Sequence, residues 1–491
     1  MQGFRRKAAP KEPPELKSAI MPDAEEARLT APAPDGTAQT THSTRRVYAE
    51  TEAPRLPEAA GPLPAPSGDP FEPSRRPAAG VGTVGRGTIV LLVVATFGGA
   101  MALIVPMAFT LALRLDALAP GRQELLGYTI GIGAVFSLLA SPLTGILSDR
   151  TRNRWGRRRP FTVGGLVLGI AATPIMAFAP DPFTLTVGWV LCTVGWGTAV
   201  GSIGNYQADR LPLHQRGKVS ALTVLTMQVS PVAGILLIGL VSKDTLWVFA
   251  IPSLVGAVCV ACFIIFVKEP DTRGAVFPER LSLLRLIRSF GFNPRKEQDF
   301  AWTWLGRFVF FFGLSLTTSF STFFYAQRLG IEVSMVASVL AVISAASVLS
   351  ATVGSLGAGW LSDHWARRRP FIMAATVLFA LGASVTAFAN DLASLLAGTL
   401  LSSLGIAVFS AVGQALVLDV LPHRDTQAGR FMAITSFSQK IPGALAPFAA
   451  TLLLSLATAG DAKNYTLLYL SSGILALAGG LITLLAVRSV R

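Results

Sequence analysis

The chain has 491 residues, of which 51% are hydrophobic and only 14% are charged, and its formal net charge is +14. Soluble domains carry roughly 25% charged residues, so this composition excludes a protein that covers its whole surface with water-facing side chains. Lys and Arg lie in short clusters between apolar segments and not on a basic face with interleaved aromatic residues, which excludes a nucleic-acid-binding protein.

Residues 1–80 differ in composition from the rest of the chain. They hold 14 of the 31 prolines, mixed charges and few large apolar side chains. Such a segment cannot bury enough apolar surface to offset its ordering entropy, so we expect a disordered cytoplasmic tail. The segment lacks an apolar stretch near its start, which argues against a signal peptide.

From about residue 88 the chain becomes a series of apolar runs, each about 20 residues long, which is the length that spans a bilayer. In lipid every backbone N–H and C=O must be hydrogen-bonded within its own segment, so each run predicts a helix. The sequence therefore predicts an all-α polytopic membrane protein with twelve transmembrane helices, over residues 88–113, 124–147, 161–180, 183–207, 219–242, 245–267, 301–327, 333–361, 371–389, 392–418, 430–457 and 465–487.

The basic residues between these helices are unevenly distributed. Most lie after the second, fourth, sixth, eighth and tenth helices, whereas the other gaps hold five: Arg114, Arg122, Lys243, Arg328 and Lys463. Basic loops stay on the cytoplasmic side, so we expect both termini in the cytoplasm and the protein in the cytoplasmic (inner) membrane. The longest connection, 268–300, is then a cytoplasmic linker.

Several short motifs occur twice in the same order, which predicts an internal repeat. An offset of 210–214 residues relates Gly145–Asp149 to Gly359–Asp363, Arg158–Phe161 to Arg368–Phe371, Asp209–Pro212 to Asp419–Pro422, and Gln228–Pro231 to Gln439–Pro442. The repeat predicts two pseudo-symmetric six-helix halves, residues 85–267 and 301–487, that rock about a central site.

The loop after the second predicted helix carries the most specific motif. Gly145 is followed by Asp149 and then by a basic run that contains Arg150, Arg154 and Arg158. Together with the twelve spans and the repeat, this loop resembles the signature of the major facilitator superfamily. Its residue pattern is most similar to that of the glycoside–pentoside–hexuronide and sucrose-carrier branch. The resemblance implies a secondary transporter that works by alternating access and moves a sugar or glycoside with protons.

The same resemblance implies a conformational latch at the cytoplasmic ends of the helices. Asp149 with Arg150 and Arg154 would form a latch that breaks when the carrier opens inward, and Asp363 with the run 367–369 would form a second one. Gly145 would permit a close approach of helices. The alternative is that the arginines only set the topology. The predicted latch residues are Gly145, Asp149, Arg150, Arg154, Arg158 and Asp363.

Charged groups within a bilayer are costly and mark functional sites by default. Arg307 in the seventh predicted helix and Lys440 near the middle of the eleventh stand out, and Lys440 lies between Gln439, the repeat partner of Gln228, and Pro442. A proline-broken helix with polar groups at the midplane is typical of a transport site. The alternatives are snorkelling of Arg307 to the headgroups and a structural contact of Lys440 with backbone carbonyls.

In the family that the loop resembles, the first, fourth, seventh and tenth helices line the cavity. Candidates for solute contact there are Trp196, Asn205, Tyr325 and Gln414. The predicted helices hold no Asp or Glu deep in the membrane, so the usual proton carrier, a buried acid, is not visible and an uncoupled carrier stays an alternative.

Other classes of activity leave no trace in the sequence. A phosphate-binding G-x-x-x-x-G-K-[ST] loop is missing, which argues against transport driven by ATP, and nothing assembles a catalytic set. We expect neither cofactor nor metal, and we interpret Cys192, Cys259 and Cys262 as apolar packing residues. The expected partners of this monomer are a small solute, protons and the lipid bilayer. Two other functions stay open: a proton-coupled exporter of drugs or a natural product, and a membrane sensor that has lost transport.

Overall fold

The computed structural model describes residues 84–240, 245–274, 291–365, 367–456 and 463–487. Every regular element in these ranges is a helix. The predicted disordered tail, residues 1–80, lies outside the described ranges, and so does the middle of the predicted linker 268–300.

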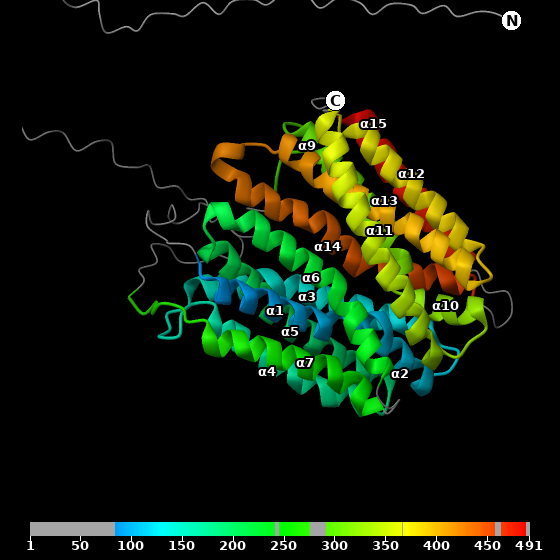
Figure 1. Cartoon of the computed structure of the whole chain (residues 1–491). Coiled ribbons are helices and arrows are strands. Elements are labelled where there is room, and N and C mark those ends of the chain that lie inside the picture. The colour runs from blue at the N-terminus through cyan, green and yellow to red at the C-terminus, as the bar shows by residue number, and fades with distance from the viewer. Residues whose placement is uncertain (1–83, 241–244, 275–290, 366, 457–462, 488–491) are drawn as a thin grey trace, which may run out of the picture. The chain divides into compact units, whose positions relative to one another are not determined.

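The helices follow the predicted spans closely (Figure 1). The N-terminal half consists of α1 (Arg86–Val105), a π-helical turn η1 (Pro106–Thr110), α2 (Leu111–Leu118), α3 (Glu124–Arg150), α4 (Arg159–Ala177), α5 (Pro182–Arg210), α6 (Leu213–Gly239) and α7 (Thr245–Phe266). The C-terminal half consists of α9 (Gln298–Thr318), α10 (Ser321–Leu329), a short 3₁₀ turn η2 (Val333–Met335), α11 (Val336–His364), α12 (Arg369–Ala387), α13 (Leu392–Asp419), α14 (Arg424–Leu456) and α15 (Tyr465–Ala486).

Within the described residues, eleven helical segments are long and apolar enough to cross a membrane. The predicted span 430–457 is a helix too, α14, but it is not among the eleven. Ser438, Gln439 and Lys440 lie in the middle of α14 and lower its hydropathy. The predicted all-helical polytopic fold is confirmed, and α14 is its most polar long helix.

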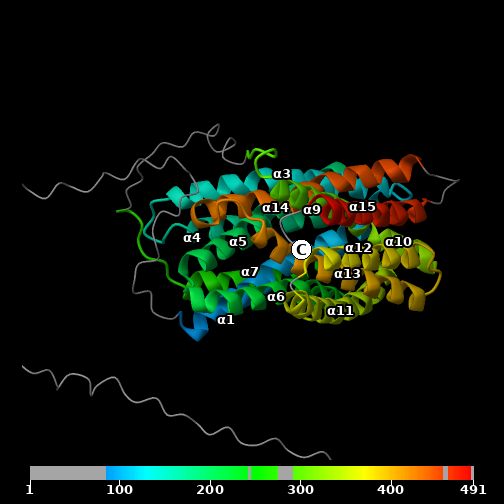
Figure 2. The same cartoon turned by 90° about the horizontal axis from the view of Figure 1, so that it is seen from above.

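The two halves repeat one pattern of helix packing (Figures 1 and 2). In the N-terminal half α5 packs on α3 and α4, and α1 packs on α6 and α7. In the C-terminal half α13 packs on α11 and α12, and α9 packs on α14 and α15. Glycines permit these contacts, because a Cβ on Gly195 would lie 2.5 Å from Gly169 N and a Cβ on Gly479 would lie 2.6 Å from Gly306 O.

Two pairs of long helices join the halves, α3 with α14 and α6 with α11. We call the end of the bundle with the connections 151–158, 211–212 and 365–368 the basic end, and the end with the connections 119–123, 178–181 and 388–391 the far end.

The interface between α3 and α14 is closed at the far end and open at the basic end. A Cβ added to Gly127 would lie 2.0 Å from Thr451 Oγ1, and one added to Gly131 would lie 2.6 Å from the Phe448 ring. Near the basic end of the same helix, a Cβ on Gly145 would meet nothing within 4 Å. The predicted close approach at Gly145 is therefore not made in this conformation.

Polar contacts hold the halves together at the far end. Lys463 Nζ lies 3.5 Å from Glu124 Oε2, Tyr465 Oη donates to Gln123 Oε1, and Thr451 Oγ1 donates to Glu124 O at 3.3 Å. The broken first helices of the two halves also meet, because the hydroxyl of Thr322 in α10 donates to the Ala108 carbonyl in η1. The described conformation is therefore closed at the far end.

Candidate functional site

A polar face of α14 lies on the side toward the N-terminal half. At about 100° per residue, Lys440 points to the same side of the helix as Pro447 and Thr451, which are buried against Gly127 of α3, and Gln439 points about 100° away from it. Gln439 and Lys440 themselves are exposed. The face of α14 that packs on α3 at the far end is therefore exposed to solvent near the middle of α14. There Lys440 Nζ lies 3.3 Å from Ser141 Oγ of α3.

Gln228 lies on α6 and is exposed like its repeat partner Gln439 on α14. Both helices take part in the contacts between the halves, α6 with α11 and α14 with α3. The predicted polar pair therefore lies on the two helices that face the opposite half, one in each half.

Arg307 is buried in the C-terminal half. Its side chain extends from α9 toward α13, where Nη1 would lie 3.0 Å from a Cβ on Gly413, and Cζ lies 5.4 Å from the centre of the Phe311 ring. The residue is 7% exposed. Arg307 lies near the middle of α9, which begins at Gln298 and has 21 residues, and its role stays a prediction.

The four other predicted solute contacts occupy different environments. Trp196 is 0% exposed, and its indole is packed between α4 and α7, because a Cβ on Gly169 would lie 2.7 Å from Nε1 and one on Gly256 would lie 2.9 Å from Cη2. Tyr325 is buried in α10 near the far end. Asn205 on α5 and Gln414 on α13 are half-buried. Their contact with solute stays a prediction.

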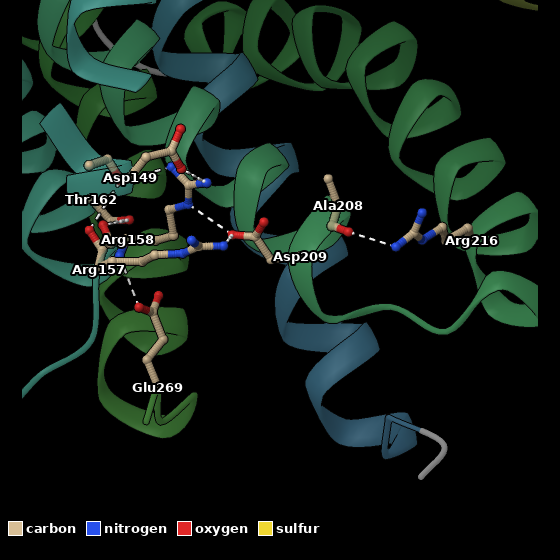
Figure 3. Close-up of polar contacts among 9 residues, drawn as sticks. Asp149, Arg157, Arg158, Thr162, Ala208, Asp209, Arg216 and Glu269 are labelled. Atoms are coloured by element: carbon tan, nitrogen blue, oxygen red, sulfur yellow. Dashed lines mark hydrogen bonds and ion pairs between the residues drawn. The ribbon is translucent and has the colours of Figure 1, made fainter. Parts of the chain in front are cut away.

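A buried arginine ties three helices together at the basic end of the N-terminal half (Figure 3). Arg158, just before α4, forms an ion pair with Asp149 at the end of α3, and its Nε donates to Asp209 Oδ2 of α5 at 2.9 Å. Its Nη1 donates to Ser148 Oγ at 3.0 Å, and Arg157 pairs with Asp209 at 2.8 Å. We call Asp149, Arg158 and Asp209 the N-terminal clamp.

Glu269, which follows α7, supports the N-terminal clamp (Figure 3). Its Oε2 accepts a hydrogen bond from the backbone N–H of Arg158 at 2.9 Å. Gly156 has a φ of +94°, and a Cβ there would lie 2.2 Å from Glu269 Cβ, so only glycine fits between the loop and this side chain. Burial raises the pKa of Glu269. Glu269 belongs to no motif, so its role could not be predicted from the sequence.

The C-terminal half contains a matching clamp. Arg368 forms an ion pair with Asp363 at the end of α11, donates from Nε to Asp419 Oδ2 of α13 at 3.3 Å and donates from Nη1 to Ser362 Oγ at 2.8 Å. This C-terminal clamp is more open to water, because the Arg368 side chain is 18% exposed and that of Arg158 is 8% exposed. Asp209 and Asp419 were visible as repeat partners but not as clamp residues.

Among the predicted latch residues, Asp149 and Arg158 form an ion pair in this conformation, and the latch itself stays a prediction. Asp149 pairs with Arg158, whereas the guanidinium of Arg154 lies 5.8 Å from the centre of the Trp155 ring. Arg150 is the last residue of α3. The second predicted latch residue, Asp363, pairs with Arg368, a member of the predicted run.

Replacing Glu269 by Gln is expected to remove one component of the pH dependence of stability. Because the pKa of Glu269 is raised above 4.5, the folded protein keeps a proton there that the unfolded chain has released. The wild type therefore loses stability relative to Glu269→Gln as the pH rises from about 4.5 through the raised pKa. Melting temperatures of both proteins in detergent test this, and a difference that stays constant with pH would contradict it.

Comparison with solved structures supports the architecture. The chain is similar to the nucleoside transporter NupG, with a TM-score of 0.63 at 12% identity over 80% of this chain and 98% of that one. It is also similar to a D-xylose-proton symporter, with a TM-score of 0.63 at 13% identity over 82% of this chain and 98% of that one. At these identities the likeness shows the fold alone.

Curated relatives match only short segments. They include an uncharacterized symporter, sll1374, of Synechocystis sp. (41% identical over 61 residues, 12% of this chain and 11% of the relative) and a general alpha-glucoside permease of Schizosaccharomyces pombe (45% over 49 residues, 10% and 9%). Sucrose transport protein SUT1 of Oryza sativa subsp. japonica is 34% identical over 76 residues, 14% of each chain. The matched segments thus cover less than a sixth of these relatives.

A family profile matches nearly the whole helical part of the chain. The profile described as Major Facilitator Superfamily matches residues 88–353 and again 303–491. The family consists of membrane transporters and not of enzymes, in agreement with the helical fold and its repeat. The chain belongs to the Major Facilitator Superfamily and is a multi-pass secondary transporter.

Proposed function

We propose that this transporter moves a sugar or glycoside together with protons by alternating access. The observation that carries the proposal is the α3–α14 interface, tightly packed at Gly127 and Gly131 and open at Gly145, with the exposed Lys440 between them. Such a half-closed interface between two repeated halves suits a carrier that exposes its site to one side at a time. The names of the partial relatives, a sucrose transport protein and an alpha-glucoside permease, support the sugar.

The basic end is proposed to face the cytoplasm. Basic connections between membrane helices stay on that side, which places both termini there. The described conformation, closed at the far end, then corresponds to the inward-open state of an importer in the cytoplasmic membrane. In this state Lys440 is reached from the cytoplasm, where the solute would be released.

Uptake into proteoliposomes tests the proposal. Labelled disaccharides and monosaccharides are offered with and without an inward proton gradient to the wild type and to Lys440→Ala. We expect uptake that is driven by the gradient and that falls at least tenfold in Lys440→Ala, because this cation lies in the open part of the interface. Lys296→Ala, which removes an exposed lysine just before α9, is the matched control and should leave uptake unchanged.

The absence of sugar uptake under every gradient would overturn the proposal. Extrusion of amphipathic compounds from the same liposomes would then support a proton-coupled exporter. Sugar uptake that ignores the proton gradient would keep the substrate class and remove the coupling.

A further inference from the structure

A cavity lies at the basic end of the N-terminal half, where α4 begins and α7 ends. Its volume is about 420 Å³, and Trp155, Arg159, Val163 and Ile264 line it. The two helices pack on each other and lie at the lower edge of the bundle in Figure 1. None of the lining residues belongs to α3 or α14, so this cavity is separate from the interface at which we place the solute.

The cavity continues into an exposed apolar face of α4. Val163, Val167 and Ile170 follow Arg159 along the helix at intervals of about one turn, and Val167 and Ile170 are exposed. Both α4 and α7 are long and apolar enough to cross a membrane, so this face lies against lipid. Because α4 has 19 residues, about the length that crosses the hydrocarbon core, its first residue, Arg159, lies at the level of the lipid headgroups.

The internal repeat relates this cavity to a position that the C-terminal half fills by itself. The offset of 210 residues that relates the two clamp arginines also pairs Trp155 with Trp365, Arg159 with Arg369, and Val163 with Met373. In the C-terminal half, Arg369 donates from Nε to the carbonyl of Leu484, near the end of α15, at 3.1 Å. The guanidinium therefore meets the negative end of a helix of the protein itself.

The N-terminal half does not make the equivalent contact. Ile264 holds in α7 the position that Leu484 holds in α15, because each lies three residues before a buried valine that follows its helix, Val267 or Val487. The side chain of Arg159 nevertheless forms no hydrogen bond or ion pair with any residue that the structure describes, and both Arg159 and Ile264 line the cavity. The space beside the arginine is thus left open to a ligand.

The chemistry of the lining favours a ligand with a phosphate and an apolar chain. Arg159 is the charged residue of the lining, and the guanidinium of Arg154 lies 5.8 Å from the centre of the Trp155 ring. Glu269 is bonded to the backbone N–H of Arg158 at 2.9 Å and does not line the cavity. A guanidinium binds phosphate well, and an exposed tryptophan beside apolar side chains is typical of the membrane interface.

We propose that the cavity binds an anionic phospholipid of the leaflet at the basic end, with its phosphate on Arg159 and an acyl chain along Val163 and Val167. The phosphate takes the place beside Arg159 that the Leu484 carbonyl takes beside Arg369. The lipid then fills, in the N-terminal half, the contact that the C-terminal half makes within its own chain. The inference goes beyond the proposed function, because it does not depend on the solute.

Native mass spectrometry of the full-length protein tests the proposal. The protein in detergent is mixed with phosphatidylglycerol or with phosphatidylcholine of the same acyl chains, and the bound fractions give the two affinities. We expect phosphatidylglycerol to bind about fivefold more tightly, which is the contribution of one basic residue at a membrane surface. Glycerol phosphate, which has the phosphate without acyl chains, should bind far more weakly than the lipid, because the chains supply most of the binding.

Three variants connect the preference to the cavity. Arg159→Met should abolish the preference for phosphatidylglycerol. Val163→Met introduces the residue that the repeat has at this position, and it should weaken the binding of both lipids because it narrows the cavity. Arg273→Met is the matched control, since it removes the same charge from an exposed arginine that pairs with Asp271, and it should leave both affinities unchanged.

Two outcomes would overturn the lipid site. Equal affinities for the two lipids, or a preference that persists in Arg159→Met, would mean that Arg159 does not bind the phosphate. Binding of glycerol phosphate as tight as that of phosphatidylglycerol would mean that the cavity takes a free phosphate and not a lipid. Neither outcome affects the proposed sugar transport, which uptake into proteoliposomes tests separately.

Discussion

A Gly127→Val variant is expected to lose the conformation that is open at the basic end. A Cβ at residue 127 would lie 2.0 Å from Thr451 Oγ1, 2.7 Å from Pro447 O and 2.8 Å from the Phe320 ring. Pro447 O belongs to the backbone of α14, so α3 and α14 must separate at the far end. Overpacking costs about 1–3 kcal/mol, which lowers the population of this conformation by roughly 5- to 150-fold.

Gly145→Val is the matched variant on the same helix and should act in the opposite direction. Nothing lies within 4 Å of a Cβ at this position, so the described conformation accepts the side chain. In a carrier that alternates, the basic end must close in turn, and valine would oppose that closure. Both variants should therefore transport slowly, for opposite reasons.

Cysteine labelling distinguishes the two variants. Ser436→Cys, on the exposed face of α14, is introduced after Cys192, Cys259 and Cys262 have been replaced by Ser. We expect maleimide to react with Ser436→Cys more slowly in Gly127→Val and at least as fast as wild type in Gly145→Val. Equal rates in the two backgrounds would contradict the account of the α3–α14 interface.

Arg158→Ala is expected to destabilise the N-terminal half. The substitution leaves Asp149 and Asp209 without their shared cation and removes the donor to Ser148. Breaking a buried pair costs about 3–5 kcal/mol, and the partial exposure of the two carboxylates reduces this to about 2 kcal/mol. For a chain of this size the melting temperature should fall by about 2 °C.

Arg368→Ala makes the equivalent change in the C-terminal clamp and serves as the comparison. Its partners Asp363 and Asp419 are 68% and 41% exposed, so water replaces more of the lost interaction. The loss of melting temperature should be about half of that in Arg158→Ala. A larger loss in Arg368→Ala would mean that burial does not govern the strength of the clamps.

The positions of the helices could be predicted from the sequence, because a bilayer demands about 20 apolar residues for each crossing. The breaks in the first helix of each half could not be predicted. The π-helical turn at Pro106–Thr110 and the interruption between α9 and α10 leave the run of apolar residues intact. Hydropathy therefore predicts where the chain crosses the membrane and does not show how straight the helix is.

The partner of Asp149 shows a second limit, because several arginines follow it and the sequence pattern does not show which of them reaches it. Arg158 reaches Asp149 because the loop 151–157 returns the chain to the start of α4. Asp209 could be found in the sequence as the repeat partner of Asp419. Only the packing of α5 against α3 and α4 shows that Asp209 also binds Arg158.

The environment of Arg307 depends on a distant segment of the chain. The guanidinium of Arg307 has room against α13 because residue 413 is glycine, and a Cβ there would lie 3.0 Å from Nη1. Nothing in the local sequence of α9 distinguishes this buried arginine from one that reaches the headgroups. The conformation of the protein is likewise absent from the sequence pattern, since the same apolar faces must pack in both states of a carrier.

The π-helical turn η1 holds one extra residue in the first membrane helix. In this turn the N–H of Leu111 bonds to the Pro106 carbonyl five residues back, so the turn holds one residue more than an α-helical turn. Deleting Met107 would restore a regular helix and leave the residues that follow in nearly the same orientation, because it removes only the extra residue of the turn. A residue inserted after Leu111, in regular helix, would instead rotate Arg114 by about 100° away from the Ala179 carbonyl and turn the buried face of α2 outward. The first membrane helix should therefore tolerate the loss of one residue between Pro106 and Thr110 but not a change of length between Leu111 and Leu118.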